Sequence, residues 1–495
     1  MTTVLWLRRD LRVHDHPALV AAHEAGGPVV PLFVADPTLV ASAGAPRLAA
    51  LHQALAALRE ATGGALVVRA GRPDDVVPAL VREVGATSVH VSAETTPYGR
   101  RRDARAERVL ADLEVPLVAT GSPYAVTPGR VLGTSGRPYQ VFGPFARAWR
   151  DHGWRRPAEV PAGLRWRTGV AGDGVLPGEA AAASMARGPE GATSAAGDTG
   201  ASPAPVLAAA LQGRSAARAS GPALTEVTED AAHRLWEEFC DDGLERYAAD
   251  RDRPDLAATS GLSVHLKYGT IHPRTILADI AAHPAGRGAG AASFVTELAW
   301  REFYADVLWH HPASAWTDLR PALHGMRYDD PDRDPRAAER LAAWQAGRTG
   351  YPFVDAGMRQ LLAEGFVHNR VRMVVASFLV KDLHVWWVHG ARWFMAHLRD
   401  GDVASNSHGW QWVAGTGTDA APYFRVFNPV AQGRRFDPDG AYVRRYVPEL
   451  AHVGGAAVHE PWAAPDGYAG GYPARLVDHA AEREEALARY AAARG

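Results

Sequence analysis

The sequence predicts an α/β domain with a doubly wound parallel sheet, followed by an all-α domain. Over residues 1–130, short β-branched runs alternate with helical patterns, which is typical of parallel strands joined by crossover helices. From about residue 223 onward, helical periodicity dominates and β-branched runs are scarce. Between these parts, residues 167–222 are rich in Gly, Ala, Ser and Pro without periodicity, so we expect a disordered insert in an interdomain linker.

Five candidate strands and four helices account for the N-terminal part. The strands are expected at Val4–Leu7, Val29–Val34, Ala65–Arg69, Ser88–Ser92 and Pro116–Ala119. The helices are expected at Pro17–Ala25, Pro46–Glu60, Asp74–Val84 and Tyr98–Asp112. The first strand is followed by Arg8-Arg9-Asp10-Leu11-Arg12 rather than by a glycine-rich turn. A dinucleotide-binding fingerprint is therefore absent, which disfavours NAD as a cofactor.

Six further helices are predicted in the C-terminal part. They are expected at Asp230–Asp241, Ser293–His310, Asp334–Gln345, Pro352–Glu364, Val367–Leu383 and Arg392–Leu398. The final segment, HAAEREEALARYAAAR, predicts a charged, exposed tail helix to which we assign no chemistry. The expected division is an α/β domain at 1–130, a linker at 131–222 with the insert at about 167–222, a helical domain at 223–455 and a tail at 456–495.

Composition limits the possible partners and surroundings. The chain of 495 residues is too long for one compact core and long enough to bury a large cofactor. Its formal net charge of -2 gives no global basic signature, so any field that binds nucleic acid must be local. The single cysteine, Cys240, excludes an intrachain disulfide and a cysteine-based metal cluster. With no signal sequence and a longest apolar run of only Met373 to Val380, we expect an intracellular, cytoplasmic protein.

A cluster of hydroxyls precedes a helical stretch at Thr259, Ser260, Gly261, Leu262 and Ser263. Hydroxyls and backbone N–H groups at a helix start suit an anion such as a pyrophosphate. A simple N-cap would use the same residues, and the pattern alone leaves both interpretations open.

A second group shares one helical face. Glu297, Trp300 and Arg301 stand at positions i, i+3 and i+4, so a carboxylate, an indole and a guanidinium would face the same way. That face suits a flat heterocycle. The alternative is an i,i+4 salt bridge between Glu297 and Arg301 beside a core tryptophan.

The stretch 366–427 holds the chain's densest chemistry, including five tryptophans. Asn369 and Met373 lie one helical turn apart, with Arg370 and Arg372 on flanking faces. Arginine offers phosphate or carboxylate a planar fork, and asparagine can read an amide-like edge. A solvated basic helix end is the competing interpretation.

Asp400, Gly401, Asp402 and Asn406 are expected on a loop after the helix that carries Trp393. Two close carboxylates suit Mg²⁺ or Ca²⁺, but the other oxygen ligands of a calcium loop are missing. The histidines show no zinc-site spacing, so we expect no metal.

Taken together, these segments resemble the photolyase/cryptochrome family, and within it the bacterial class I cyclobutane pyrimidine dimer photolyases. The resemblance covers nearly the whole chain except the insert and the tail. Its motifs, in the family's order and approximate spacing, are TSGLS at 259–263, ELAWREFY at 297–304, TGYPFVDAGMRQL at 349–361, HNRVRM at 368–373, DGD at 400–402 and TGTDAAPYFRVFNP at 416–429.

The resemblance implies an N-terminal antenna domain and a C-terminal helical domain that holds FAD in a U-shape. The residues implied to hold FAD are Tyr247, Thr259, Ser260, Gly261, Leu262, Ser263, Phe294, Arg301, Arg372, Asp400, Gly401, Asp402 and Asn406. Arg372 would pair with Asp400. Asn406 would lie near the reactive N5 of the flavin, where plant photoreceptors of the family usually carry another residue.

The resemblance also implies a substrate. Family members that repair (6-4) photoproducts carry two histidines where this chain has Asn369 and Met373. Those two residues, with Glu297 and Trp300, resemble instead the catalytic pocket for a flipped-out cyclobutane pyrimidine dimer. The residues implied to contact DNA are Arg251, Glu297, Trp300, Tyr304, Asn369, Arg370, Trp412, Arg425 and Gln432.

Two accessory roles follow from the same resemblance. Trp410 and Trp387 match the first two members of the family's photoreduction chain, whereas Tyr328 stands where the third tryptophan is usual. Three outcomes are open: Tyr328 serves as the third member of the chain, Trp316 or Trp386 takes that position instead, or photoreduction is slow. Arg47 and Glu94 resemble a pair that binds a deazaflavin antenna; methenyltetrahydrofolate is the other candidate chromophore, and a surface arginine and a strand-end carboxylate are the structural alternatives.

The implied function is light-dependent repair of cyclobutane pyrimidine dimers in DNA by a monomeric deoxyribodipyrimidine photo-lyase, a carbon–carbon lyase. Electron transfer from excited, reduced FAD would split the dimer. A cryptochrome-like blue-light signalling flavoprotein is the main alternative, and a flavoprotein without photoactivity or a tryptophan-rich scaffold is the third.

Overall fold

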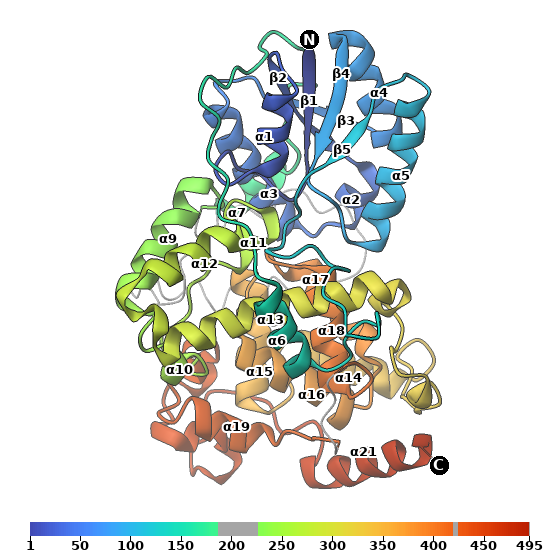
Figure 1. Cartoon of the computed structure of the whole chain (residues 1–495). Helices are drawn as coiled ribbons and strands as arrows, with labels where there is room; N and C mark the ends of the chain where they lie inside the picture. The colour runs from blue at the N-terminus through green and yellow to red at the C-terminus, as the bar shows by residue number, and fades with distance from the viewer. Residues whose placement is uncertain (187–225, 419–423, 495) are drawn as a thin grey trace.

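The computed structural model of the protein describes residues 1–186, 226–418 and 424–494. A parallel sheet flanked by helices occupies one end of the molecule, and a larger group of helices occupies the other (Figure 1). This confirms the predicted fold class. Most of the expected insert falls within residues 187–225, outside the described residues.

The sheet has five parallel strands in the order β3-β2-β1-β4-β5. They are β1 (Thr2–Leu7), β2 (Val29–Ala35), β3 (Val67–Ala70), β4 (Ala86–Val91) and β5 (Leu117–Ala119). All five lie within two residues of the predicted positions, because buried β-branched runs form them. In register, Val4 of β1 pairs with Val30 and with Val89. The strand order reverses between β1 and β4, and the carboxyl ends of such neighbouring strands are where open α/β sheets bind ligands.

Helices cover both faces of the sheet. They are α1 (Pro17–Glu24), α2 (Pro37–Ser42), α3 (Ala45–Ala61), α4 (Pro73–Val84) and α5 (Pro97–Ala111). Successive side chains of a strand point to opposite faces. Leu5 and Leu7 accordingly pack with α1 and α3, whereas Val4 and Trp6 pack with α4 and α5.

The segment after β5 crosses to the helical part and returns. Its helix α6 (Phe142–His152) packs Phe145 against Phe303. The chain then rejoins the sheet, where the Arg167 N–H donates to the Val29 carbonyl at 2.9 Å. Helix α7 (Glu179–Ala186) packs on α3. Residues 167–186 therefore differ from the expected unstructured linker, because their backbone hydrogen bonds and α7 tie them to the sheet half.

The remaining elements are helical. The α-helices are α9 (Glu229–Asp242), α10 (Tyr247–Asp250), α11 (Ser263–Tyr268), α12 (Pro273–Ala282), α13 (Ala289–His310), α14 (Pro335–Gln345), α15 (Pro352–Glu364), α16 (Asn369–Ser377), α17 (Trp387–His397), α18 (Val403–Ala414), α19 (Pro429–Phe436), α20 (Ala441–Tyr446) and α21 (His479–Arg494). Short 3-10 turns connect several of them. None of the helices in the described ranges is long and apolar enough to cross a membrane.

The region predicted as one helix at 367–383 is divided. Helix α16 begins at Asn369, where the His368 side chain accepts a hydrogen bond from the Arg370 N–H, and it passes into a π-helix at Phe378–Asp382. Asn406 was expected on a loop but lies in the first turns of α18, because the Asp402 carboxylate caps that helix by accepting from the Ser405 N–H.

The tail helix α21 is docked rather than free. Ala486 is buried beside Met326 and Phe424. His384, which has a φ of 55°, also binds this helix through a 2.8 Å contact with Glu482. These contacts hold α21 beside the π-helix.

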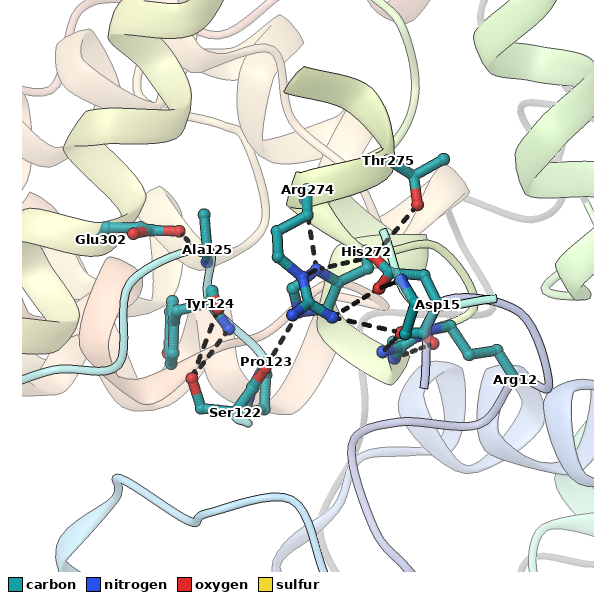
Figure 2. A network of polar contacts seen from close by, with 12 residues as sticks. Arg12, Asp15, Ser122, Pro123, Tyr124, Ala125, His272, Arg274, Thr275 and Glu302 are labelled. Atoms are coloured by element: carbon teal, nitrogen blue, oxygen red, sulfur yellow. Dashed lines mark hydrogen bonds and ion pairs between the residues drawn. The ribbon is translucent and has the colours of Figure 1, made fainter. Parts of the chain in front are cut away.

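A buried polar cluster joins the two ends of the molecule (Figure 2). Arg274 of α12 lies 2.5 Å from the Asp15 carboxylate of the sheet half, and His272 donates to the Ser122 carbonyl at 2.9 Å. Burial would raise the pKa of Asp15, but the hydrogen bond with His272 and the charges of Arg274 and Arg12 outweigh it and lower the pKa to about 2. The cluster fixes the sheet half against the helical half.

Candidate functional site

A cavity of about 530 Å³ lies among α11, α13, α16 and α18. Most of the predicted site residues line it. These are Arg251, Thr259, Ser260, Gly261, Leu262, Ser263, Glu297, Trp300, Arg301, Tyr304, Asn369, Arg370, Arg372, Met373, Asp400, Asp402, Asn406, Trp410 and Trp412. Residues that are distant in sequence therefore share one cavity, whose volume lies in the usual range for cofactor pockets, about 300–1,000 Å³.

Other predicted residues do not line this cavity. They are Tyr247, Phe294, Gly401, Trp387, Tyr328, Arg425, Gln432, Arg47 and Glu94. Tyr247 and Phe294 are buried in an aromatic cluster with ring centroids 5.2 Å apart. Burial raises the pKa of Tyr247 to about 12. These two side chains form the packing behind the cavity wall.

The hydroxyl-rich loop before α11 keeps its hydroxyls away from helix capping. The N-cap position of α11 is Leu262, and no side chain caps that helix. Gly261 has a φ of 67°, a conformation that favours glycine. The simple N-cap interpretation is thus wrong, and Thr259, Ser260 and Ser263 line the cavity where they can bind an anion.

Arg372 and Asp400 form the predicted pair. Arg372 donates through Nη2 to Asp400 Oδ2 at 2.8 Å and through Nε to the Val367 carbonyl at 2.6 Å. The other carboxylate oxygen, Asp400 Oδ1, is buried and has no hydrogen-bond partner among the described residues. Because a buried polar atom without a partner is costly, this oxygen is available to a donor on a bound ligand.

Asp402 is paired with a residue from the other half of the molecule. Arg9, just after β1, places Nη2 2.5 Å from Asp402 Oδ2. Burial would raise the pKa of Asp402, but the charges of Arg9 and Lys267 hold it well below its usual range. The carboxylate is therefore ionised at the cavity wall.

Asn406 and Trp410 lie on the cavity side of α18. The Asn406 amide donates to the Ala391 carbonyl of α17 at 3.0 Å, which fixes its orientation. Trp410 packs against Gly390 so closely that an added Cβ would lie 2.2 Å from the ring. Glycine at position 390 thus lets the indole approach α17.

Glu297 forms its ion pair across the cavity rather than along its own helix. Its carboxylate lies 2.6 Å from Arg251. Arg301 instead donates to the carbonyls of Pro123 and Leu266, both at 3.0 Å. The i,i+4 salt-bridge alternative is therefore wrong.

Trp300 is supported from behind by a residue of the crossing segment. The ring of Phe142 stacks on Trp300 with centroids 3.7 Å apart and planes 6° from parallel. Offset-stacked aromatic rings attract each other, so Phe142 restricts the indole. Trp300 itself lines the cavity.

Asn369, Arg370 and Met373 lie at the start of α16. Arg370 pairs with Asp252 at 2.8 Å and lies over the Phe436 ring at 4.5 Å. These partners argue against a simply solvated basic helix end. Asn369 is exposed and therefore lies at the cavity's accessible edge.

Arg47 and Glu94 have separate partners outside this cavity. Arg47, on α3, donates through Nη2 to the Ser42 carbonyl at 2.7 Å, and Glu94, which follows β4, lies 4.0 Å from Arg102. Burial would raise the pKa of Glu94, but the charges of Arg9 and Arg102 lower it. Arg47 Nε is buried without a hydrogen-bond partner among the described residues. Burial and the charge of Arg9 lower the pKa of neighbouring Lys267 to about 7.

Sequence reasoning missed Arg9, Lys267 and Phe142. Arg9 had a signal, because it directly follows β1 at the point where the strand order reverses. Phe142 had none, since nothing local shows that α6 would cross to α13. In the described ranges, no group of three or more His, Cys, Asp or Glu side chains is arranged to hold a metal ion.

The chain matches two family models. Residues 3–162 match that of DNA photolyase, and residues 294–492 match that of the FAD binding domain of DNA photolyase. A deoxyribodipyrimidine photo-lyase of Streptomyces griseus is 40% identical, with 99% of both chains covered. Another, of Halobacterium salinarum, is 38% identical, again with 99% of both chains covered.

Solved structures share the fold. A bacterial class III photolyase from Agrobacterium tumefaciens is 34% identical at a TM-score of 0.83, covering 99% of this chain and 97% of that one. A Synechocystis cryptochrome is 25% identical at a TM-score of 0.82, with 98% of both covered. An archaeal photolyase from Sulfolobus tokodaii, described with two FAD molecules, is 25% identical at a TM-score of 0.77, covering 99% and 100%.

Proposed function

Since the chain belongs to the DNA photolyase family, we propose that it is a deoxyribodipyrimidine photo-lyase that uses light to repair cyclobutane pyrimidine dimers in DNA. The observation that carries the proposal is one cavity lined by three kinds of feature: the hydroxyl-rich loop at 259–263, the partly buried pair of Arg372 and Asp400, and the rings of Trp300 and Trp412. The fold alone does not separate repair from signalling, because a cryptochrome shares it. Identity to photo-lyases of up to 40% over the full chain favours repair over the cryptochrome alternative.

The residues of the cavity fit FAD. The hydroxyls of Thr259, Ser260 and Ser263, none of which caps α11, suit the pyrophosphate. Asp400 Oδ1, which has no hydrogen-bond partner among the described residues, suits a donor on the flavin ring. Arg372 would hold Asp400 in place, and Asn406, fixed on Ala391, would lie at the ring edge. When bound, reduced and excited, FAD supplies the electron that opens the dimer.

Glu297, Trp300, Asn369, Met373 and Trp412 would receive the dimer. A dimer turned out of the helix loses its stacking partners, which the Trp300 and Trp412 rings would replace. Trp412 Nε1 is buried and unpartnered among the described residues, so it can donate to a dimer carbonyl. Glu297, held by Arg251 at 2.6 Å, would orient the dimer and exclude water.

The rim would bind the phosphates beside the dimer. Arg251 and Arg370 are already held by Glu297 and Asp252, which orients their guanidinium groups at the edge of the cavity. Tyr304 lines the cavity on α13. Arg425 is exposed beyond the cavity and Gln432 is half-buried on α19, so the footprint would extend along the segment before α19 and onto it.

A second chromophore would lie near the carboxyl ends of β1 and β4. The charges of Arg47 and Glu94 both act on Lys267, and an α/β sheet of this order binds ligands at that edge. We propose a deazaflavin, with methenyltetrahydrofolate as the other outcome. Mass spectrometry of the chromophores released from the purified protein distinguishes the two. Loss of the second chromophore, but not of FAD, is expected for Arg47→Ala.

The same proposal has the protein act as a cytoplasmic monomer on lesion-containing DNA. Sedimentation of the FAD-loaded protein with and without a lesion-containing duplex tests the monomer. Fractionation of cells tests the location.

The deciding experiment measures repair directly. FAD-loaded, chemically reduced protein is mixed with DNA that carries thymine dimers and is illuminated with near-UV or blue light, with a dark sample as control. Loss of dimers only in the light supports the proposal. Reduced, FAD-loaded protein that binds the DNA but leaves the dimers intact in the light would overturn it.

A further inference from the structure

Asp318 joins the indole N–H groups of two neighbouring tryptophans. Trp387 donates through Nε1 to Asp318 Oδ1 at 2.6 Å, and Trp386 donates to the same oxygen at 3.4 Å. The two rings meet edge to face with centroids 6.1 Å apart. Trp387 is fully buried and Trp386 is half-buried, so the pair leads from the core toward the surface.

The position of Asp318 is fixed by the helix that carries Trp410. The next residue, Leu319, donates its N–H to Gln411 Oε1 at 2.8 Å, and the Arg320 N–H donates to the Thr416 carbonyl at 3.0 Å. Trp410 lines the cavity and packs on Gly390, one turn along α17 from Trp387. These hydrogen bonds therefore hold the Asp318 carboxylate against Trp387, which follows Trp410 on the route out of the cavity.

No ion pair of Asp318 occurs within the described residues. A partly buried carboxylate without a cation partner stabilises positive charge on a neighbouring ring. A one-electron oxidised indole is such a ring, and it is also a strong acid at its N–H. The 2.6 Å hydrogen bond gives that proton a direct acceptor.

Tyr328 lacks this arrangement. Its hydroxyl is buried and has no hydrogen-bond partner among the described residues. Burial, and then the charge of Asp318, raise the pKa of Tyr328 well above its usual range. A phenol loses its proton when it is oxidised, so a phenol without an acceptor is a poor electron donor.

We propose that Asp318 is the proton acceptor of the electron-transfer chain that reduces the flavin, and that the chain continues through Trp386 rather than Tyr328. This rests on the proposed function. Trp410 would give one electron to the light-excited, oxidised cofactor when it is bound, and Trp387 would return one electron to Trp410. The Nε1 proton of Trp387 moves to Asp318 Oδ1, which leaves a neutral tryptophanyl radical and a neutral carboxylic acid. One electron from an added thiol, passed through Trp386, and the proton from Asp318 then restore Trp387.

The test is transient absorption after a laser flash on FAD-loaded protein in its oxidised form. The wild type is expected to form a long-lived neutral tryptophanyl radical, and the formation of this radical should be slower in D₂O. Asp318→Asn keeps an acceptor oxygen but is no base, so a radical cation should persist, recombine faster, and lower steady-state photoreduction by thiol about tenfold or more. Asp318→Glu should restore the neutral radical, Trp386→Phe should slow its reduction by the added thiol, and Tyr328→Phe should change nothing.

Identical radical spectra and lifetimes in wild type and Asp318→Asn would overturn the proposal, as would loss of the long-lived radical in Tyr328→Phe. All rates are normalised to bound FAD, so that a folding defect is not mistaken for a proton-transfer defect. Repair by chemically reduced wild-type protein is measured separately, because it needs no photoreduction. Absent repair would then contradict the proposed function, whereas normal repair with unaltered radicals would contradict only the role of Asp318.

Discussion

The Arg9 guanidinium lies 2.5 Å from the Asp402 carboxylate, although the two residues belong to opposite halves of the molecule. Asp402 also caps α18, which carries Asn406 and Trp410. Arg9, at the end of the first strand, thus reaches the cavity and balances the negative charge of the Asp402 carboxylate in its wall. Stability and cofactor binding are expected to depend on this contact together.

Arg9→Gln should lower the free energy of unfolding by about 3 kcal/mol, the lower end of the range for breaking a buried ion pair, because the charge of Lys267 remains nearby. Urea unfolding of the FAD-free protein measures the change. Arg72→Gln removes an exposed partner of Asp74 and should leave the stability unchanged. Equal effects of the two variants would contradict the importance of the Arg9 pair.

Phe142→Ala should weaken binding of dimer-containing DNA about two- to tenfold, since aromatic pairs contribute about 0.5–1.5 kcal/mol beyond their buried area. Phe142 stacks on Trp300 but does not itself line the cavity. Affinity for undamaged DNA should stay the same. Phe142→Tyr keeps the ring and serves as the matched control. Fluorescence anisotropy with lesion-bearing and intact duplexes measures both affinities, and an unaltered preference for the lesion would argue against the support role.

Arg372→Gln should speed FAD dissociation at least tenfold. The substitution leaves the Asp400 carboxylate, which is 6% exposed, without its cation partner. Arg372→Lys keeps the charge but loses the second hydrogen bond to Val367, so an intermediate rate is expected. Release of flavin fluorescence on dilution follows dissociation. If Arg372→Gln retained FAD as well as wild type, Asp400 would not be a flavin ligand.

Glu297→Ala should lower the repair yield per absorbed photon several-fold while FAD stays bound. The carboxylate is held by Arg251, not by a residue of the loop at 259–263. The repair yield of Glu297→Gln, which keeps a hydrogen-bond acceptor, should lie between those of the wild type and Glu297→Ala. Repair per flash and flavin absorbance are read on the same samples. Loss of flavin from Glu297→Ala would show that the residue belongs to the cofactor site instead.

Two sets of buried groups should act in opposite directions on stability between pH 7 and pH 4. Burial raises the pKa of Glu302 to about 7 and of Asp306, Asp382 and Asp437 to about 6, so these carboxyls favour the folded state as the pH falls, whereas the buried histidines disfavour it. Burial lowers the pKa of three histidines to about 4 and of a fourth to about 3; they are His265, His272, His368 and His408. Their ordinary value is 6.5, so between pH 6.5 and 4 the unfolded chain binds more protons at these histidines, and their contribution to the free energy of unfolding falls as pH falls. Above pH 6.5 these histidines should have no effect.

Urea titrations from pH 8 to pH 5 measure the slope of the free energy of unfolding against pH. His408→Gln should reduce it by up to about 1.4 kcal/mol per pH unit, the amount for one proton. Equal pH dependence of stability in wild type and His408→Gln would contradict the prediction.

Much of the site could be predicted because its residues recur in short, ordered motifs. Asn369 and Met373 share a helical turn, and that spacing alone brings them together at the cavity edge. Asn406 was placed on a loop since nothing in the sequence showed that Asp402 would start a helix. The pairing of Glu297 with Arg251 was also hidden, because an i,i+4 partner on the same helix looked sufficient.

What the sequence could not show was contact between distant segments. Phe142 and Trp300 are 158 positions apart by number and meet only because α6 crosses to α13. Asp318 stood in an irregular segment without periodicity, and its role depends on two indoles at 386 and 387. The beginning of the insert was misplaced for a similar reason, since residues 167–186 gain their structure from the sheet and α3 rather than from local preference.

The π-helix at Phe378–Asp382 determines the direction in which its own side chains point relative to those of α16. It lies between α16, which carries Met373, and the irregular residues 383–386 that precede α17. Each residue of a helix advances the side-chain direction by about 100°, and a π-turn contains one more residue than an α-turn. Deleting one residue here would restore regular helical hydrogen bonds. It would also turn Asp382 by about 100° relative to Met373 and break its 2.5 Å contact with His479 of α21, so the length of this turn fixes the docking of the tail helix.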